Sequence, residues 1–324
     1  MPDTGATAST SKHKLKGGDS IVDSNLVGEG WPAVQPGPDP VLYGHVQLTP
    51  KGAFEARSLQ TFTLVYTVGR FGLDDTGAIR VVFRAMGDAG RLQISDPAAP
   101  NYVTAQASNG ATLSVEYSRR GASARPRWKS LTIGVSGGYL SEGDTITITF
   151  GDTGGGSPGM QMQTFVEKGF EFKVLADVCA VGHFTPIPNT PTISIVPGQP
   201  EVWRAVLSSL RRPGENFIFG LKAEDKWGNP TEHAEGSFIL EANLPVNNLP
   251  DRFDYPQGER AVTFEGLSVD EPGELRITVR DAETGAFVCE SHPMMIRVGQ
   301  YSGYWGDLHG QSGESIGIGT SRAY

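Results

Sequence analysis

The residues best suited to chemistry lie close to the C-terminal end of the sequence, in the stretch Tyr304-Trp-Gly-Asp-Leu-His-Gly-Gln-Ser-Gly-Glu-Ser315. If this stretch is a strand, Asp307, His309 and Gln311 point to the same face, because side chains alternate along a strand. A carboxylate beside an imidazole is a suitable ligand pair for zinc, manganese or iron. A metal site needs three or more ligands, so the remaining ligands must come from other segments.

The other histidines lie scattered in different segments of the chain, so a serine–histidine–aspartate site finds no support. A lone histidine on a strand or loop is usually solvated or structural. The two cysteines, Cys179 and Cys289, are far apart and have no Cys-x-x-Cys neighbour, so no thiolate zinc site is expected. Two free thiols are expected, and a single bridge between them stays open.

Composition restricts the classes of partner. The 324 residues carry a formal net charge of -9, with no long run of Lys and Arg, so a nucleic-acid partner is not expected. The N-terminal segment lacks the apolar core of a signal peptide, and no apolar run is long enough to cross a membrane. The sequence therefore predicts a soluble protein of the cytoplasm, with no membrane partner.

The segments that must position these residues have the sequence pattern of strands. Short alternating apolar runs, 42 glycines and 22 prolines are typical of an all-β protein. We expect an extended lead-in over residues 1–40, a β-sandwich module over 41–183, a linker over 184–191 and an Ig-like β-sandwich module over 192–299. Residues 300–324 then begin a further domain.

Three short stretches that each contain a glycine beside an acidic residue organise the strands. Glu142-Gly-Asp144, Pro213-Gly-Glu215 and Pro272-Gly-Glu274 each precede an alternating run, so each predicts a turn with a left-handed glycine that leads into a strand. Residues 201–212 fit either a helical stripe or a strand–turn–strand unit. We favour the strands, because Pro213 and Gly214 follow at once.

An exposed tryptophan offers a second candidate for binding. The segment Ala223-Glu-Asp-Lys-Trp-Gly-Asn-Pro230 places Trp227 beside a turn at the end of a predicted strand. An aromatic side chain there could form a platform for a sugar, but we favour the interpretation that Trp227 packs against the sandwich. The segment resembles strand ends in Ig-like modules of bacterial proteins, which supports the fold and no activity.

The C-terminal stretch itself resembles the opening strand of a catalytic domain in the polymerase-and-histidinol-phosphatase superfamily. It is most similar to a large bacterial branch that carries a domain of unknown function after a β-rich N-terminal region. The resemblance implies a distorted β/α barrel in which a His-x-His pair binds divalent metals (Zn, Mn or Fe) that activate water for hydrolysis, as in phosphoesterases. His309 matches the first histidine and Asp307 the acidic residue before it, while Gln311 stands in place of the second histidine and is a metal or substrate contact.

Only 15 residues follow His309, which is too few for a barrel of roughly 200 or more residues. We therefore expect a fragment whose partner is a missing C-terminal catalytic domain, and which binds no metal and is inactive alone. On this hypothesis the two modules are accessory parts of a metal-dependent hydrolase.

Two alternatives remain open. One is a stand-alone module that binds a carbohydrate or a protein, and an exposed row among Trp31, Trp128, Trp203 and Trp227 favours it. The other is an intact small metalloenzyme, which requires His183, His233 or His292 close to His309.

Overall fold

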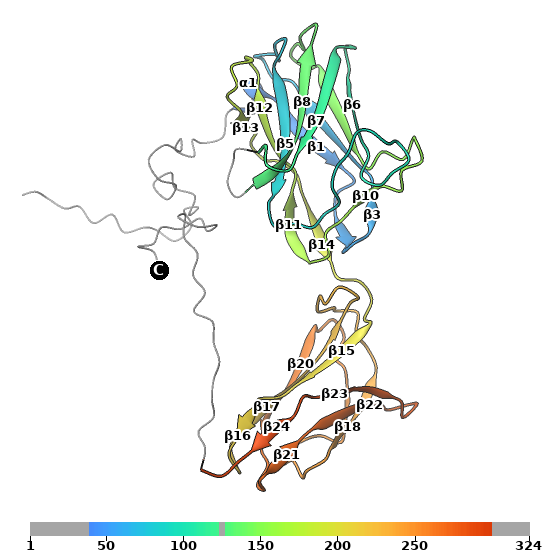
Figure 1. Ribbon diagram of the computed structural model, residues 1–324, viewed down its shortest axis with the longest axis vertical. Coiled ribbons are helices and arrows are strands. Elements are labelled where there is room, and N and C mark those ends of the chain that lie inside the picture. The colour runs from blue at the N-terminus through green and yellow to red at the C-terminus, as the bar shows by residue number, and fades with distance from the viewer. Residues whose placement is uncertain (1–38, 123–126, 300–324) are drawn as a thin grey trace, which may run out of the picture. The chain divides into compact units, whose positions relative to one another are not determined.

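The structure is a computed structural model that describes residues 39–122 and 127–299. Within these residues nearly every regular element is a strand, which confirms the predicted all-β class (Figure 1). The one helix among them is the four-residue α1 (Pro40–Tyr43), whose first turn is capped by Asp39 through its bond to the Val41 amide at 2.9 Å. No helix in the described residues is both long enough and apolar enough to span a lipid bilayer.

The first module contains two antiparallel sheets packed face to face (Figure 1). One sheet has the order β1 (His45–Thr49), β4 (Phe62–Thr67), β9 (Thr145–Phe150) and β6 (Val103–Ala107). The other has the order β13 (Thr185–Pro186), β12 (Lys173–Asp177), β5 (Ala78–Arg84), β8 (Arg127–Ser136) and β7 (Thr112–Ser118). Neighbouring strands are often distant in sequence, as in Greek-key sandwiches.

Alternation of apolar and polar residues explains why these segments form sheets with a shared core. Along β4, Phe62, Leu64 and Tyr66 are fully buried while the intervening side chains are partly exposed. Aromatic rings join the two sheets, since the Phe83 ring of β5 lies 6.1 Å from the Phe150 ring of β9. The alternation predicted from sequence is therefore the feature that places one face of each strand inside the sandwich.

Two smaller sheets lie beside the main pair. β3 (Leu59–Gln60) pairs with β10 (Met160–Gln161), and β14 (Thr192–Val196) pairs with both β11 (Glu167–Glu171) and β2 (Ala53–Glu55). The predicted linker at 184–191 and the predicted start of the second module at 192 do not match this pairing. β13 lies within the linker range and pairs with β12, and Ile193 and Ile195 of β14 belong to the first core. The first module thus extends to Val196, because apolar residues beyond the prolines still have partners in its sheets.

The second module is a smaller sandwich with its own core (Figure 1). One sheet has the order β15 (Val202–Val206), β17 (Phe217–Glu224) and β20 (Ala261–Leu267). The facing sheet has the order β19 (Arg252–Asp254), β18 (Ser237–Ala242), β22 (Ile277–Asp281) and β23 (Phe287–Glu290). A third sheet has the order β16 (Leu210–Arg211), β24 (Met294–Ile296) and β21 (Gly273–Leu275). Strands β15 and β16 show that residues 201–212 form strands and not a helix.

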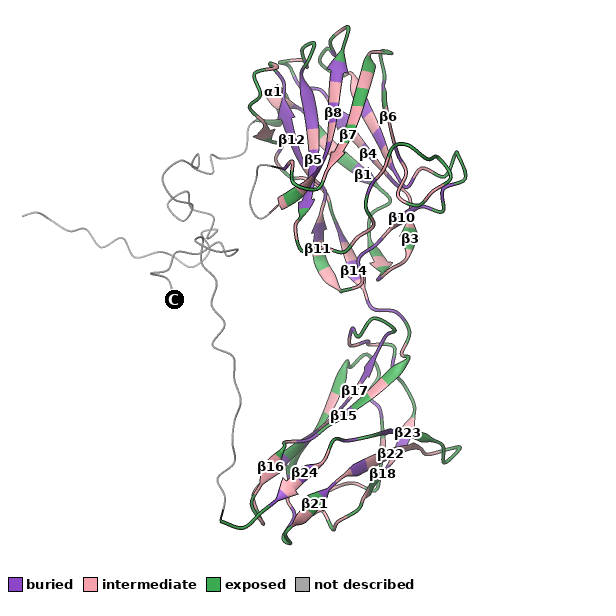
Figure 2. Ribbon diagram, in the orientation of Figure 1, coloured by how far each residue is buried: buried purple, intermediate pink, exposed green. Residues whose placement is uncertain are grey.

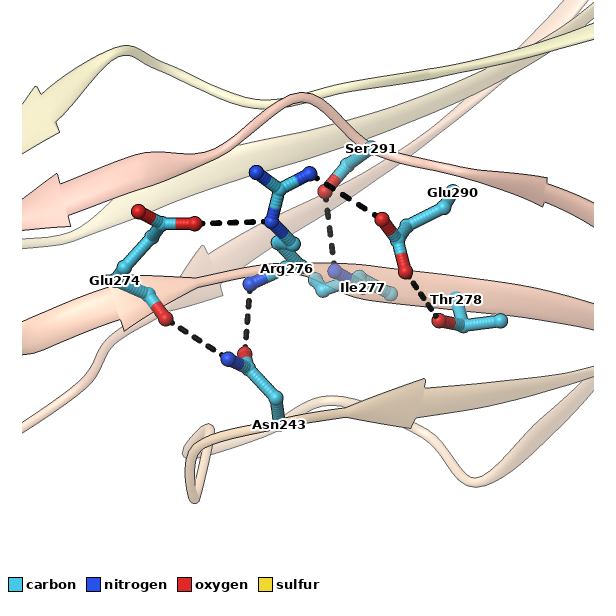
Figure 3. A network of polar contacts seen from close by, with 7 residues as sticks. All are labelled: Asn243, Glu274, Arg276, Ile277, Thr278, Glu290 and Ser291. Carbon is cyan, nitrogen blue, oxygen red and sulfur yellow. Dashed lines mark hydrogen bonds and ion pairs between the residues drawn. The ribbon is translucent and has the colours of Figure 1, made fainter.

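Side chains stabilise the bend between β21 and β22 (Figure 3). The Asn243 amide accepts a hydrogen bond from the Arg276 backbone at 2.7 Å and donates one to the Glu274 carbonyl at 2.9 Å. The Arg276 guanidinium contacts Glu274 at 2.9 Å and Glu290 at 3.3 Å, and the Ser291 hydroxyl accepts from the Ile277 amide at 3.0 Å. The ion pairs are exposed and contribute little, so the Asn243 and Ser291 bonds to backbone groups hold this bend.

Two of the three predicted turns have the expected left-handed backbone conformation at their glycine. Gly143 and Gly214 have φ of 87° and 73°, and each precedes a strand, as a left-handed turn glycine should. Gly273 differs, because it lies inside β21 in an extended conformation. A Cβ at this position would lie 2.9 Å from the end of the Leu244 side chain, which can shift, so neither turn geometry nor the backbone requires glycine there.

Candidate functional site

The predicted metal residues Asp307, His309 and Gln311 lie outside the described residues. Among residues 39–122 and 127–299, no group of three or more His, Cys, Asp or Glu side chains is arranged to hold a metal ion. His183, His233 and His292 are all exposed in the structure. Their distance from His309 is not described, so the metal site and the hydrolase parent stay predictions.

The structure instead contains a pocket of about 260 Å³ in the first sandwich. Buried apolar side chains line its interior, namely Phe83 of β5, Leu92, Met160 of β10 and Phe170 of β11. The outer part contains Met86, which is 76% exposed, and Phe165, which is 42% exposed. An apolar cavity with exposed methionine and aromatic side chains at its entrance is a typical binding site for an apolar group.

Two loops carry the entrance and are tied to each other. Met86 lies in the loop between β5 and β6, and Phe165 lies between β10 and β11. The Asp88 carboxylate accepts hydrogen bonds from the Thr164 amide at 2.9 Å and the Thr164 hydroxyl at 2.8 Å. Burial acts to raise the pKa of Asp88, but these bonds and Arg57 outweigh it and hold the pKa below its usual range. The charged carboxylate therefore joins the two loops to each other.

Polar side chains complete the wall of the pocket. Gln163 is buried, and its amide donates to the Phe165 carbonyl at 3.1 Å and to Glu167 at 2.9 Å. Arg84 pairs with Glu167 at 3.1 Å, and Arg127 pairs with Glu171. These acidic groups already have cationic partners, so the wall has little uncompensated negative charge.

Lys129 of β8 is the cation that lines this pocket without an ion pair among the described residues. Its side chain is half-buried, and its ammonium donates to the Gly87 carbonyl. Burial lowers the pKa of Lys129, Arg119 lowers it further, and Asp88 acts in the opposite direction. A half-buried cation without an ion pair favours a ligand that brings negative charge.

Asp225 and Asn229 hold the turn that carries Trp227. The Asp225 carboxylate accepts from the amides of Trp227 at 2.8 Å, Asn229 at 2.9 Å and Gly198 at 3.1 Å, and from the Asn229 side chain at 2.8 Å. Asn229 in turn donates to the Thr164 carbonyl at 2.8 Å and accepts from the Val166 amide at 3.1 Å. The Asp-x-x-x-Asn spacing of this segment is thus explained by backbone hydrogen bonding.

The tryptophans do not form an exposed row within the described residues. Trp128 is 45% and Trp227 is 43% exposed, whereas Trp203 packs against Phe238 and Tyr255. The cations of Arg57 and Lys226 each lie 5.6 Å from the centre of the Trp227 ring. Trp31 lies outside the described residues. The indole of Trp227 therefore has two cations beside it and is not a free platform for a sugar.

Comparisons with known proteins do not assign the chain to a family. No family model matches the chain, and no curated protein shows significant similarity to it. Among solved structures, the adhesin InvE of Yersinia pseudotuberculosis is 11% identical over 78% of this chain and 58% of its own, with a TM-score of 0.24. The Escherichia coli adhesin FdeC is 13% identical over 79% of this chain and 63% of its own, with a TM-score of 0.26.

A marsupial T cell receptor is 8% identical over 78% of this chain and 71% of its own, with a TM-score of 0.25. The chain spans about three fifths of the length of the two adhesins. TM-scores this low do not establish a common fold, so the fold described above depends on the strand pairing of this chain itself.

No motif in the sequence predicts the pocket. Its lining comes from strands and loops that are distant in sequence, and no motif connects them. One signal was present, since the apolar Met86 lies beside Gly87, Asp88 and Gly90. Such a residue is a weak indication of a binding surface.

Proposed function

We propose that the first sandwich is a binding module whose pocket accepts an apolar group of its ligand. The observation that carries this proposal is the cavity of about 260 Å³, with a buried apolar interior and with Met86 and Phe165 exposed at its entrance. A concave, mainly apolar site with a few polar groups in its wall is the usual form of a ligand pocket. This proposal agrees with the binding-module alternative derived from the sequence.

The cavity volume limits what enters it. It is slightly smaller than the roughly 300 to 1,000 Å³ of pockets that enclose whole small molecules. A single side chain or ring therefore fits, while the rest of the ligand lies on the surrounding surface. The fixed loops reduce the ordering cost of binding, because the Asp88 bonds already hold them.

The test uses anilinonaphthalene sulfonate, an aromatic anion that fluoresces in apolar sites. We expect the whole chain to bind it, and Met86→Glu to weaken binding about tenfold, because the substitution removes apolar contact and adds negative charge at the entrance. Val181→Glu is the matched control, since Val181 is 73% exposed in the same module and does not line the pocket. Equal binding by both variants, or no binding by the unaltered chain, would contradict the proposal.

A further inference from the structure

Strand β7 is the last strand of its sheet and has one free edge. Within the described residues it pairs only with β8, from Thr112 opposite Ser136 to Ser118 opposite Ser130. The free edge of such a strand presents backbone N–H and C=O groups that can pair with another chain. All seven residues of β7 take part in the pairing with β8, so the edge is long and regular enough to guide an added strand.

The side of the sandwich at β7 is only partly covered. The inward residues Leu113, Val115 and Tyr117 are only half-buried, and the intervening residues of β7 are mostly exposed. Figure 2 shows this strand in the colours of intermediate and exposed residues, with no buried segment. Fully inward residues of the neighbouring β8, such as Leu131 and Ile133, are completely buried. A strand added along β7 would cover this apolar row and remove it from water.

The partly covered side leads to the pocket. Tyr117 is the last of the three inward residues of β7, and it also lines the pocket together with Lys129 of the adjacent strand. Burial raises the pKa of the Tyr117 hydroxyl, although Arg91 and Arg119 lower it in part. A strand added to β7 would therefore reach the pocket entrance at the level of Tyr117, and one of its side chains could enter the cavity.

Positive charge is concentrated at this end of β7. Arg119 follows the strand directly, and both Arg91 and Arg119 act electrostatically on the Tyr117 hydroxyl. Lys129 is influenced by Arg119 and by the carboxylate of Asp88, which already bonds to Thr164 and contacts Arg57. Within the part of the chain that the structure describes, Arg91 and Arg119 form no ion pair. In a protein with a net charge of -9, this local excess of positive charge favours an acidic partner.

From these observations we infer that the free edge of β7 binds an acidic, extended polypeptide segment as an additional strand, with an apolar side chain of that segment seated in the pocket. Backbone pairing with β7 supplies affinity, the pocket selects the anchor side chain, and Arg91, Arg119 and Lys129 select negative charge. The inference rests on the proposed function of the pocket and adds the class of partner. A sugar ligand is disfavoured, because the exposed indoles of Trp128 and Trp227 are not part of the pocket lining.

The test uses a labelled seven-residue peptide in which glutamate alternates with valine around a central phenylalanine, and fluorescence anisotropy with the whole chain. A peptide with lysine in place of glutamate is the charge control. We expect the acidic peptide to bind at least about tenfold more tightly than the basic one, and to lose affinity as salt is raised.

Two isomers of the acidic peptide test the strand pairing. One carries N-methyl groups on the odd-numbered residues and the other on the even-numbered residues, so each blocks hydrogen bonding along one edge of the peptide. Because β7 pairs with one edge only, one isomer should lose binding by about tenfold or more while the other retains it. Equal binding by both isomers would overturn the inference.

Charge-reversal variants test the cationic residues. Arg91→Glu combined with Arg119→Glu should weaken binding of the acidic peptide by about tenfold. Arg252→Glu combined with Arg297→Glu is the control, since both arginines are exposed in the second module and the net charge changes equally. If both pairs weaken binding equally, the inference is wrong. If anilinonaphthalene sulfonate binds in a Met86-dependent way but the acidic peptide does not bind, the inference fails while the proposed pocket function stands.

Discussion

Replacing Asp225 by alanine should destabilise the second module strongly. Asp225 is 2% exposed and accepts four hydrogen bonds, three of them from the backbone amides of Gly198, Trp227 and Asn229. A hydrogen bond contributes about 1 kcal/mol net, and a donor left buried without a partner costs about as much or more. Four lost bonds therefore predict a loss of about 3 to 4 kcal/mol in the free energy of unfolding.

The assay is equilibrium unfolding of the whole chain in urea at neutral pH, followed by tryptophan fluorescence. Asp281→Ala is the matched control, because Asp281 also accepts three turn hydrogen bonds, from Glu283 and Thr284, but lies at a solvent-exposed hairpin end. The loss in the free energy of unfolding for Asp281→Ala should be clearly smaller, since water replaces the missing acceptor. A loss below about 1 kcal/mol for Asp225→Ala, or equal losses for both variants, would show that these buried hydrogen bonds do not stabilise the module.

The pH dependence of this effect has a definite sign. Burial acts to raise the pKa of Asp225, but hydrogen bonds from Asn229, Gly198 and Trp227 outweigh it and lower the pKa below the unfolded value of about 3.9. A group with a lowered pKa contributes stability above its unfolded pKa and loses it as the pH falls through the folded value. The difference between Asp225→Asn and the unaltered chain should therefore shrink below about pH 4.

Three further outcomes are expected. Phe172→Ala should cost the first module about 3 to 5 kcal/mol in urea unfolding, because Phe172 is fully buried among four other phenylalanines; a cost near zero would contradict the packing. Of Cys179 and Cys289, only exposed Cys179 should react quickly with a thiol reagent at pH 8, since burial raises the pKa of Cys289 to about 11; two fast thiols in the native protein would contradict this. Gly151→Ala should lower the melting temperature, because Gly151 has φ of 64° and a Cβ would lie 2.1 Å from the Met160 amide; an unchanged melting temperature would contradict this.

The sequence predicted the fold class because the dominant signal is local. Alternation in segments such as 62–67 and 145–150 depends only on which face of a strand is buried, and the structure buries the expected face. The strand–turn–strand reading of residues 201–212 was correct for the same reason, since Pro213 and Gly214 end the run.

Module limits and sites depend on distant partners and could not be predicted in the same way. Residues 184–196 contain prolines typical of a linker, yet β13 pairs with β12 just before it, and β14 pairs with β11 and with β2, which lies far earlier in the chain. The pocket likewise combines side chains from β5, β7, β8, β10 and β11. The predicted metal residues Asp307 and His309 carried the clearest motif, but they lie outside the described residues.

Mapping of backbone amide chemical shifts tests the binding claim most directly. The whole chain is titrated with the acidic peptide, and the amides that shift are assigned. Shifts are expected in β7, in the loop residues 85–92 and in residues 162–167, with none above the background in the second module beyond the 225–229 turn, whose Asn229 bonds to Thr164 and Val166. Shifts confined to the second module, or to the surroundings of Trp128 on the outer face of β8, would contradict the binding claim.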